Sequence, residues 1–360
     1  MVRAKTLMVA AKRAANEFKT KLSMKSGRPM CKPSMVYLQV TDKCNSRCVM
    51  CGTWRDSDKV EHIPLELLKR RIDELHAWLG KAHIQLGTGE PFMHPEMLEV
   101  VRHGNSRGML MGTVTNGFLI NDNLAEGIIK SDFFNINISL DGVRPETHAI
   151  TRGFPQAFDQ AVAAIDRLVF YRKKLDGGVR IMLKPIIFRG NVDQLIPLAQ
   201  FVRDKGLNGI NFQPIQRNNP ACDELMAIED FDELRATFEQ LKRMRGEGYP
   251  ILNSDREFDA FAWYLEDPKA RPPLLDGACS VGYTNVWIMD GGVVHLCVGL
   301  EMPVGHVDDL GGFPKLWRSP EAAKVRKVIA ACKRPCLASC LIKRTLGEQF
   351  RRFTTFMKNR

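Results

Sequence analysis

The chain has 360 residues, of which 44% are hydrophobic and 26% are charged, and its formal net charge is +11. This composition is that of a folded globular protein and excludes a mainly disordered chain or a small disulfide-rich domain. No apolar run approaches the roughly 18 residues of a membrane span, and no secretory signal is seen, so we expect a cytoplasmic protein. Its ten cysteines then stay reduced, which favours metal ligation or catalysis over disulfides.

From residue 34 to about residue 245, strand-like runs alternate with helical stretches. Apolar and β-branched runs predict strands at 35–41, 83–86, 110–115, 134–140, 179–187 and 209–214. Apolar residues at helical spacing predict helices at 65–79, 96–108, 123–130, 157–171, 192–205 and 231–245. Six strand–helix repeats indicate an α/β fold with a parallel sheet, either open or closed into a partial barrel. In both cases the active site lies at the carboxyl ends of the strands.

The two ends of the chain differ from this middle part. After residue 246 the alternation stops, and five of the ten cysteines lie between residues 279 and 340. We therefore predict an N-terminal extension at 1–34, a core domain at 35–250 and a C-terminal domain with a basic tail at 251–360.

Much of the positive charge lies in the terminal arms. Residues 1–34 carry nine Lys and Arg against one acidic residue, and residues 333–360 carry eight against one. One helical face of the first arm carries Leu7, Ala11, Ala14, Phe18 and Leu22. This face predicts a helix that rests either on the body of the protein or on an anionic membrane surface as a peripheral contact. The arms lack the interleaved aromatic residues of a single-strand binder, so no nucleic-acid partner is expected.

A cysteine triplet follows the first predicted strand. Cys44, Cys48 and Cys51 form a C-x3-C-x2-C pattern, which lets three thiolates converge on one metal centre. Four thiolates would complete a zinc site or a fully ligated cubane, whereas three leave one iron open for a ligand. Cys31 precedes a strand of about seven residues and so starts some ~23 Å away, too far to be the fourth ligand. A zinc knuckle that borrows a distant ligand is the alternative.

The triplet resembles the signature of the radical S-adenosylmethionine (SAM) superfamily. That resemblance implies a partial (β/α)6 TIM-like barrel and a [4Fe–4S] cluster whose open iron is chelated by SAM. It also implies that reduction cleaves SAM to methionine and a 5′-deoxyadenosyl radical, which abstracts hydrogen from the substrate.

Further motifs extend the resemblance over about residues 35–245. The sequence GTGEP at 87–91 resembles the family's GGEP motif, although Thr88 departs from it, and Arg152 matches an arginine that pairs with the SAM carboxylate. Small residues in that motif let the backbone approach a ligand, and its glutamate can accept from an ammonium group. The cofactor-binding residues implied in this way are Met50, Gly87, Thr88, Gly89, Glu90, Asn116, Ser139, Asp141, Arg152 and Asn191.

The C-terminal cysteines form a second set. Cys279 and Cys297 flank the segment VWIMDGGVVHL, which predicts a hairpin with a Gly-Gly turn, and Cys332, Cys336 and Cys340 follow a predicted helix. This arrangement resembles the SPASM/twitch extension of many radical SAM enzymes and implies a small iron–sulfur domain with one auxiliary [4Fe–4S] cluster. The resemblance favours Cys279, Cys297, Cys336 and Cys340 as ligands, with Cys332 as a substitute. Zinc is the alternative, since four sulfur ligands suit both.

We interpret the chain as a radical SAM oxidoreductase that abstracts hydrogen from a substrate C–H bond, with dehydrogenation of a small polar metabolite or sugar as the first choice. An epimerase and a maturase of ribosomal peptides are the alternatives, and a zinc- and nucleic-acid-binding protein is the alternative from another class. The resemblance also implies an electron donor such as flavodoxin or ferredoxin. Cys222 belongs to neither cysteine set. We expect it in a loop at 218–224, after the sixth strand and therefore near the barrel mouth where the substrate should lie. Its thiol is for this reason a candidate hydrogen-atom donor.

Overall fold

The computed structural model describes residues 16–216, 220–267, 269, 279–334 and 336. Its strands are β1 (Met35–Gln39), β2 (His83–Gly87), β3 (Leu110–Thr115), β4 (Asn135–Ile138), β5 (Arg180–Leu183), β6 (Ile186–Ile187), β7 (Gly209–Ile210), β8 (Gln213–Pro214), β9 (Asn285–Met289), β10 (Val293–His295) and β11 (Pro303–His306). The α-helices are α2 (Leu65–Leu79), α3 (Met97–Ser106), α4 (Asp122–Lys130), α5 (Pro145–Arg152), α6 (Ala157–Lys174), α7 (Leu195–Asp204), α8 (Pro220–Met226), α9 (Phe231–Gly246), α10 (Asp255–Glu266), α11 (Val281–Thr284), α12 (Phe313–Trp317) and α13 (Pro320–Ala331). Four 3-10 turns are η1 (Thr53–Asp56), η2 (Pro91–Met93), η3 (Val192–Gln194) and η5 (Val298–Leu300).

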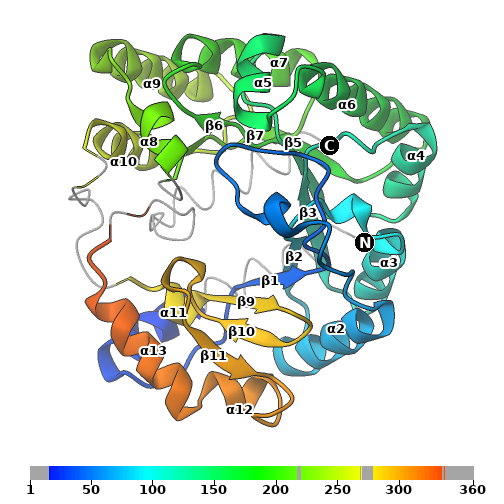
Figure 1. The fold of residues 1–360 in the computed structure, drawn as a ribbon, viewed down its shortest axis with the longest axis vertical. Coiled ribbons are helices and arrows are strands. Elements are labelled where there is room, and N and C mark those ends of the chain that lie inside the picture. The colour runs from blue at the N-terminus through cyan, green and yellow to red at the C-terminus, as the bar shows by residue number, and fades with distance from the viewer. Residues whose placement is uncertain (1–15, 217–219, 268, 270–278, 335, 337–360) are drawn as a thin grey trace.

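A nine-stranded sheet with the order β11-β10-β9-β1-β2-β3-β4-β5-β7 organises the molecule. Strands β1 to β5 and β7 pair in parallel, and the helices that connect them lie outside the curved sheet (Figure 1). The predicted partial (β/α)6 barrel is therefore confirmed. The carboxyl ends of these parallel strands meet at one edge of the barrel, so the loops that follow them lie together.

The two faces of the sheet differ in chemistry. One paired row consists of Trp287, Tyr37, Gln85, Gly112, Asn135 and Arg180, in the order of the strands from β9 to β5. The next row consists of Ile288, Leu38, Leu86, Thr113, Ile136 and Ile181, all buried. Because side chains alternate between faces along a strand, the apolar row faces the outer helices. The polar and aromatic row lines the concave side.

Helix α2 shows why the outer layer forms where the sequence predicts it. Its Leu68, Ile72 and Leu75 recur at helical spacing and are completely buried, while Lys69 on another side bridges Glu66 and Glu99. The stripe of buried leucines and isoleucine fixes which side of the helix packs on the sheet.

Two predicted strands are each divided in two. Strand β5 pairs with β7, but after an interruption the same two chain segments pair again as β6 and β8 in a separate two-stranded sheet. Pro185 lies at the interruption and has no backbone N–H to donate to a sheet ladder. The divided strands carry the chain away from the sheet at the barrel rim.

The C-terminal strands join the barrel sheet directly. Strand β9 pairs in parallel with β1, from Met35 opposite Asn285 to Leu38 opposite Ile288, and returns through the predicted hairpin into antiparallel β10. The rings of Tyr37 and Trp287 stack across this pairing with centroids 5.0 Å apart. The domain boundary that we predict at residue 250 therefore falls before a hairpin that shares the barrel's sheet.

A buried arginine clamps the C-terminal strands to helix α2. The guanidinium of Arg71, 1% exposed, donates to Gly291 O at 2.7 Å, to both carboxylate oxygens of Asp308 at 2.7 and 2.6 Å, and to Glu74 at 2.9 Å. Gly291 lies in the β9–β10 turn and Asp308 follows β11. The Arg71 side chain thus hydrogen-bonds to acceptors on its own helix α2 and on the C-terminal strands.

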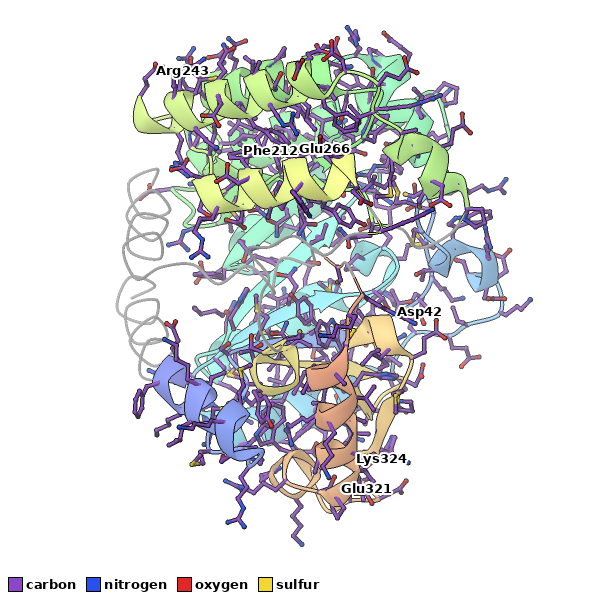
Figure 2. All side chains as sticks on the ribbon, turned by 90° about the vertical axis from the view of Figure 1, so that its left-hand side faces the viewer. Asp42, Phe212, Arg243, Glu266, Glu321 and Lys324 are labelled. Atoms are coloured by element: carbon purple, nitrogen blue, oxygen red, sulfur yellow. The ribbon has the colours of Figure 1, made fainter. Side chains whose placement is uncertain are left out.

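The described part of the N-terminal arm is a helix over residues 16–26, at the end of the molecule opposite α9 and α10 (Figures 1 and 2). In Figure 2 the labelled Arg243 and Glu266 mark α9 and α10, and Glu321 and Lys324 mark α13 on the side of the N-terminal helix. None of the described helices is both long and apolar enough to cross a bilayer.

Candidate active site

The three cysteines of the predicted triplet lie in the loop that follows β1. Cys44 N donates to Ser57 Oγ at 2.8 Å, and the indole Nε1 of Trp54 donates to Cys48 O at 3.1 Å. Burial raises the pKa of the Cys44 thiol to about 11, and nearby negative charges, including those of Cys48 and Cys51, raise it further. The loop therefore brings three thiols together at the carboxyl end of β1.

The GTGEP loop after β2 packs against the start of the cysteine loop. Thr88 Oγ1 donates to Asp42 and to Thr41 O, and Glu90 N donates to Lys43 O at 2.8 Å. Gly89 has a φ of +52°, and a Cβ placed there would lie 2.5 Å from Lys43 O. Only glycine fits this contact, so the motif's glycine positions the cysteine loop.

Glu90 is buried, and its carboxylate is held from several sides. It accepts from Thr115 Oγ1 at 2.7 Å, from Asn116 N at 2.8 Å and from Phe92 N at 3.3 Å. Burial raises the pKa of Glu90 to about 7, although these hydrogen bonds oppose the shift. Asn116 Nδ2 donates in turn to Asn45 Oδ1 at 2.8 Å, so this carboxylate is linked to the cysteine loop.

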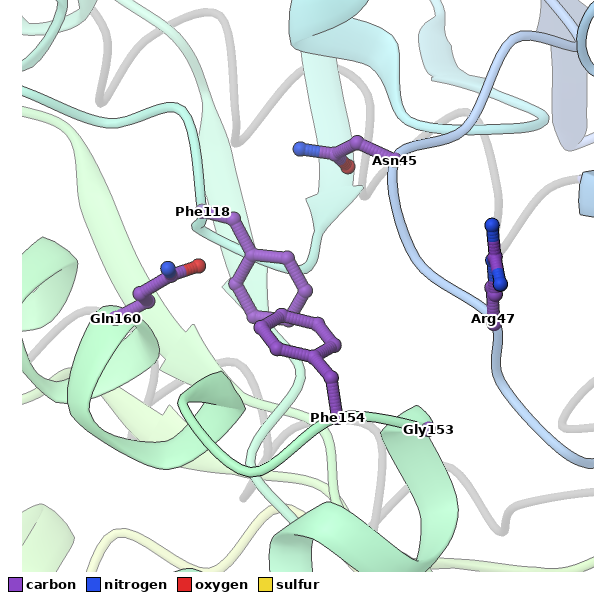
Figure 3. A pocket seen from close by; sticks show the side chains of 6 residues that line it. All are labelled: Asn45, Arg47, Phe118, Gly153, Phe154 and Gln160. Atoms are coloured by element: carbon purple, nitrogen blue, oxygen red, sulfur yellow. The ribbon is translucent and has the colours of Figure 1, made fainter.

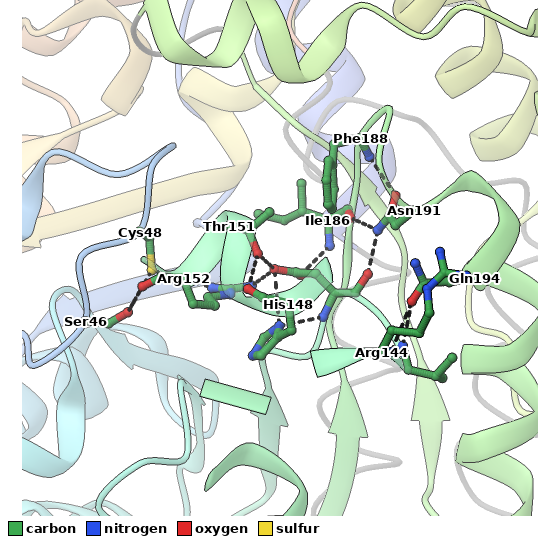
Figure 4. Close-up of polar contacts among 12 residues, drawn as sticks. Ser46, Cys48, Arg144, His148, Thr151, Arg152, Ile186, Phe188, Asn191 and Gln194 are labelled. Atoms are coloured by element: carbon green, nitrogen blue, oxygen red, sulfur yellow. Dashed lines mark hydrogen bonds and ion pairs between the residues drawn. The ribbon is translucent and has the colours of Figure 1, made fainter. Parts of the chain in front are cut away.

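A buried ion pair lies beside the second cysteine (Figure 4). Arg152 Nη2 lies 2.6 Å from Asp141 Oδ2, and its Nη1 lies 3.8 Å from Cys48 Sγ. Asp141 is fully buried and also accepts from Thr151 Oγ1 at 2.6 Å and from Ile186 N at 2.9 Å. The charge of Arg152 lowers the pKa of the Asp141 carboxyl despite its burial. Arg152 is therefore held as a cation at the edge of the triplet.

Asp141 and Asn191 act here as scaffold. The amide of Asn191 donates to Asp141 O at 2.6 Å and to Ile186 O at 2.7 Å, and its oxygen accepts from Phe188 N. The sequence prediction missed His148, whose Nδ1 accepts from Asp141 N at 3.1 Å. Burial lowers the pKa of His148 to about 4, so it is neutral at neutral pH. Nothing in the sequence of its helix, α5, indicated that His148 would accept a hydrogen bond from Asp141.

Two other predicted residues are buried near these loops. Ser139 lies directly after β4, where its backbone N donates to Thr115 O at 3.0 Å, and Met50 packs in the core with 8% exposure. Gly87 ends β2, with a cis peptide bond to Thr88. The structure thus places the predicted cofactor residues, from Met50 to Asn191, at the end of β2 and in the segments that follow β1 to β6, with Arg152 at the end of α5.

The C-terminal thiols come from three separate segments. Cys279 precedes α11, Cys297 follows β10, and Cys332 and Cys336 follow α13. Burial raises the pKa of Cys279 to about 11, and the charges of Cys297, Cys336 and Cys332 raise it further. Cys340 lies outside the described residues. Four thiols, with Cys332 among them, therefore form the group that the structure describes.

The two cysteine sets lie at opposite ends of β1. Cys44 follows the end of β1, whereas Cys279 and Cys297 lie where the parallel β9 begins and the antiparallel β10 ends. Five residues of strand span about 17 Å at ~3.3 Å each. The concave face of the sheet lies between the two sets.

Two cysteines stand apart from both sets. Cys31 is buried, with its Sγ 3.3 Å from Tyr283 O and its carbonyl bonded to the Trp317 indole, at the β1 end remote from Cys44. Cys222 lies on α8, where a loop was expected, and its side chain is fully buried. Burial in the core suits a small apolar residue, and the hydrogen-donor role of Cys222 stays a prediction.

A cavity of about 460 Å³ opens beside the cysteine loop (Figure 3). It is lined by Asn45, Arg47, Phe118, Gly153, Phe154 and Gln160. Phe118 and Phe154 form an edge-to-face pair with centroids 4.6 Å apart. No motif in the sequence pointed to this cavity, because its wall comes from three loops and helix α6, which are distant in the chain.

Comparison with known families decides what this arrangement belongs to. The model of the Radical SAM superfamily matches residues 38–201, which include the triplet, the GTGEP loop and the Asp141–Arg152 pair. Residues 38–201 therefore form a radical SAM domain.

Curated relatives of this radical SAM enzyme have several activities. The AdoMet-dependent heme synthase of Methanosarcina barkeri is 32% identical over 175 residues, which is 48% of each chain. The mycofactocin maturase MftC of Mycolicibacterium smegmatis is 25% identical over 80% of this chain and 71% of its own. The first match therefore spans about half the length of that relative.

The solved structures confirm the fold. Streptococcus suis SuiB bound to S-adenosylmethionine superposes with a TM-score of 0.67 over 85% of this chain and 73% of its own, at 13% identity. Radical SAM enzymes use a [4Fe–4S] cluster with SAM, and the SPASM/twitch relatives carry auxiliary clusters.

The residues present fit these groups. The triplet offers three sulfur donors, and the Arg152 guanidinium lies beside one of them, at Cys48. The C-terminal group offers four. Within the described ranges, no three His, Cys, Asp or Glu side chains converge closely enough to ligate a single metal ion. A cubane instead takes its thiolates at separate corners.

Proposed function

We propose that this enzyme is a maturase that oxidises a C–H bond of a peptide, and that Cys279, Cys297, Cys332 and Cys336 hold its auxiliary cluster. The observation that carries the proposal is the gathering of these four thiols from three segments. Four protein ligands leave no iron open for substrate, so this centre suits electron transfer rather than substrate binding. An oxidation needs such an electron acceptor, whereas an epimerisation does not.

When bound, the first cluster would supply the electron that cleaves SAM and thus the means to remove a substrate hydrogen atom. The second would accept the electron left behind, while the substrate's second hydrogen leaves as a proton to water. We propose that Cys44, Cys48 and Cys51 ligate the first cluster, and that Gly87 to Glu90, Asn116, Ser139 and Met50 line the SAM site. Asp141 and Asn191 would then orient Arg152 rather than contact SAM, because their polar atoms are already bonded within the protein.

The concave face between the two cysteine sets supports a peptide substrate. Tyr37 and Trp287 are partly exposed there and stack on each other, and the row continues into Gln85 and Asn135. Amide side chains can pair with the backbone of a peptide, and aromatic rings can pack against its side chains. A relative named as a maturase aligns with 80% of the chain, which favours a maturase. None of the relatives reported above is named as a sugar dehydrogenase or as a zinc- and nucleic-acid-binding protein.

The experiment compares substrate classes under one condition. The reconstituted enzyme would be incubated anaerobically with SAM and a reductant, alone or with peptide pools, with iron coproporphyrin III or with sugars. We expect peptide to raise 5′-deoxyadenosine formation well above the uncoupled background and to give a product two hydrogens lighter. A physiological reductant such as flavodoxin or ferredoxin should replace the chemical one.

A variant separates the two cysteine sets. Cys297→Ser should still form 5′-deoxyadenosine with peptide present but lose the oxidised product, while Cys48→Ser should lose both. Stimulation by the porphyrin or by a sugar alone would overturn the substrate class. A product that has unchanged mass in H2O but is one mass unit heavier after reaction in D2O would replace oxidation with epimerisation.

A further inference from the structure

The N-terminal helix at 16–26 is attached to the protein by polar side chains. Ser23, completely buried, accepts from Met30 N at 2.9 Å and from Cys31 N at 3.2 Å. Asn16 Oδ1 accepts from Lys32 N at 3.2 Å. The inward face of this helix is therefore a hydrogen-bonding face rather than an apolar one.

The apolar face of the same helix points away from the protein. Phe18 is 73% exposed and Leu22 is 43% exposed, one turn apart on the same side. At 100° per residue, Lys19 lies on one flank of this pair and Lys21 and Lys25 on the other. A helix normally buries its apolar face against the core, so this one is reversed.

The lysines on the flanks are exposed, and none of the three forms an ion pair within the part of the chain that the structure describes. An apolar ridge between rows of basic residues fits the boundary between headgroups and acyl chains of an anionic bilayer. A second copy of the chain would instead bring the same lysines face to face, which like-charge repulsion opposes.

We propose that this helix docks the enzyme on a membrane surface that contains anionic phospholipid. Phe18 and Leu22 enter the interface, and Lys19, Lys21 and Lys25 contact the headgroups. The inward hydrogen bonds of Ser23 and Asn16 keep the helix attached in this orientation. In the sequence, Leu7, Ala11 and Ala14 precede Phe18 and Leu22 at intervals of three and four residues, and these three lie outside the described part.

The test is co-sedimentation of the full-length holoenzyme with vesicles of phosphatidylcholine, with or without phosphatidylglycerol. We expect binding only with phosphatidylglycerol, and loss of binding near 1 M salt, where the Debye length is about 3 Å. The double variant Phe18→Ser/Leu22→Ser should lower the partition coefficient by at least about tenfold, because two apolar side chains no longer leave water. The triple variant Lys19→Gln/Lys21→Gln/Lys25→Gln should lower it by a similar factor at low salt.

Phe170 provides a matched control. It is 57% exposed beside Lys174 on α6, at the far end of the molecule, so Phe170→Ser should bind vesicles as the wild type does. Equal binding by the Phe18→Ser/Leu22→Ser variant, or no binding to phosphatidylglycerol at low salt, would overturn the proposal. Self-association that Phe18→Ser abolishes, without vesicle binding, would assign the face to a second copy instead.

Discussion

The substitution Asp141→Asn tests whether the buried network beside the triplet is the scaffold of the site. Asp141 is fully buried and Arg152 is 7% exposed, and their side chains meet at 2.6 Å. Removing the carboxylate charge leaves the guanidinium in the interior without its counter-charge. In addition, the new amide must turn its NH2 group toward a donor, because Arg152, Thr151 and the Ile186 backbone all donate to this carboxylate.

The expected loss of stability is large for one substitution. Breaking a buried ion pair by removing one partner costs about 3–5 kcal/mol. A misplaced amide donor adds about 1–3 kcal/mol, reduced to the extent that the side chain can shift. We therefore expect Asp141→Asn to lower the free energy of unfolding by at least roughly 4 kcal/mol, the sum of the two lower figures.

The exposed pair of Asp193 and Arg144 is the control. Their contact is also short, at 2.7 Å, but the two side chains are 47% and 49% exposed. Solvent screening should limit the loss in Asp193→Asn to below about 1 kcal/mol. Both variants would be unfolded with guanidinium under anaerobic conditions and followed by circular dichroism. Equal losses in the two variants would refute the assignment of Asp141 as the scaffold.

Three further predictions concern other parts of the chain. In reconstituted protein we expect about eight irons per chain, measured as iron and acid-labile sulfide. Cys332→Ala should lose about half of these irons, whereas Cys340→Ala should keep them all. The reverse result would assign Cys340 as the ligand. The hydrogen bond from Arg71 lowers the pKa of Asp308 to about 2, so the stability from this pair should be complete above about pH 4 and lost as the pH falls toward 2; because Asp308 is 45% exposed, we expect only about 1 kcal/mol, and Asp308→Asn should remove this acid limb from unfolding curves. Cys222→Ala should leave the yield of oxidised product unchanged. If the wild type instead makes a product with inverted stereochemistry, and only this variant fails to make it, the thiol is a hydrogen donor.

Much of the fold could be predicted because the barrel repeats one pattern. The helix at 65–79 has the predicted bounds, since Leu68, Ile72 and Leu75 mark its buried face without interruption. Strands 179–187 and 209–214 were harder to predict, because Pro185 interrupts the first run although apolar residues continue on both sides of it. Apolar content alone does not reveal where a ladder of hydrogen bonds stops.

The pairing of β1 with β9 could not be predicted. The hairpin was recognised from its Gly-Gly turn, but a turn specifies only its own two strands. Which strand a hairpin joins depends on contacts such as the stacking of Tyr37 on Trp287 and the clamp at Arg71, residues more than 200 positions from their partners. Contacts between such distant residues leave no periodic signal in the sequence.

Within the site, motif spacing predicted positions better than roles. The triplet, GTGEP and Arg152 lie together as expected, because each follows a parallel strand. Asp141 was predicted to contact the cofactor, yet its oxygens are occupied by Arg152, Thr151 and the Ile186 backbone. A sequence motif records that a residue type is needed at a place but not whether it binds a ligand or holds its neighbour.

Strand β1 connects the two cysteine sets in one rigid element. The triplet loop begins after its last residue, and the C-terminal thiols lie where its neighbour β9 begins. Because β9 is bonded to β1 along four residue pairs, the two sets cannot move apart without breaking the centre of a nine-stranded sheet. The strand between them spans about 17 Å over its five residues. A fixed separation of this kind suits an oxidation, in which a hydrogen atom leaves toward one centre and an electron toward the other from a substrate held between them.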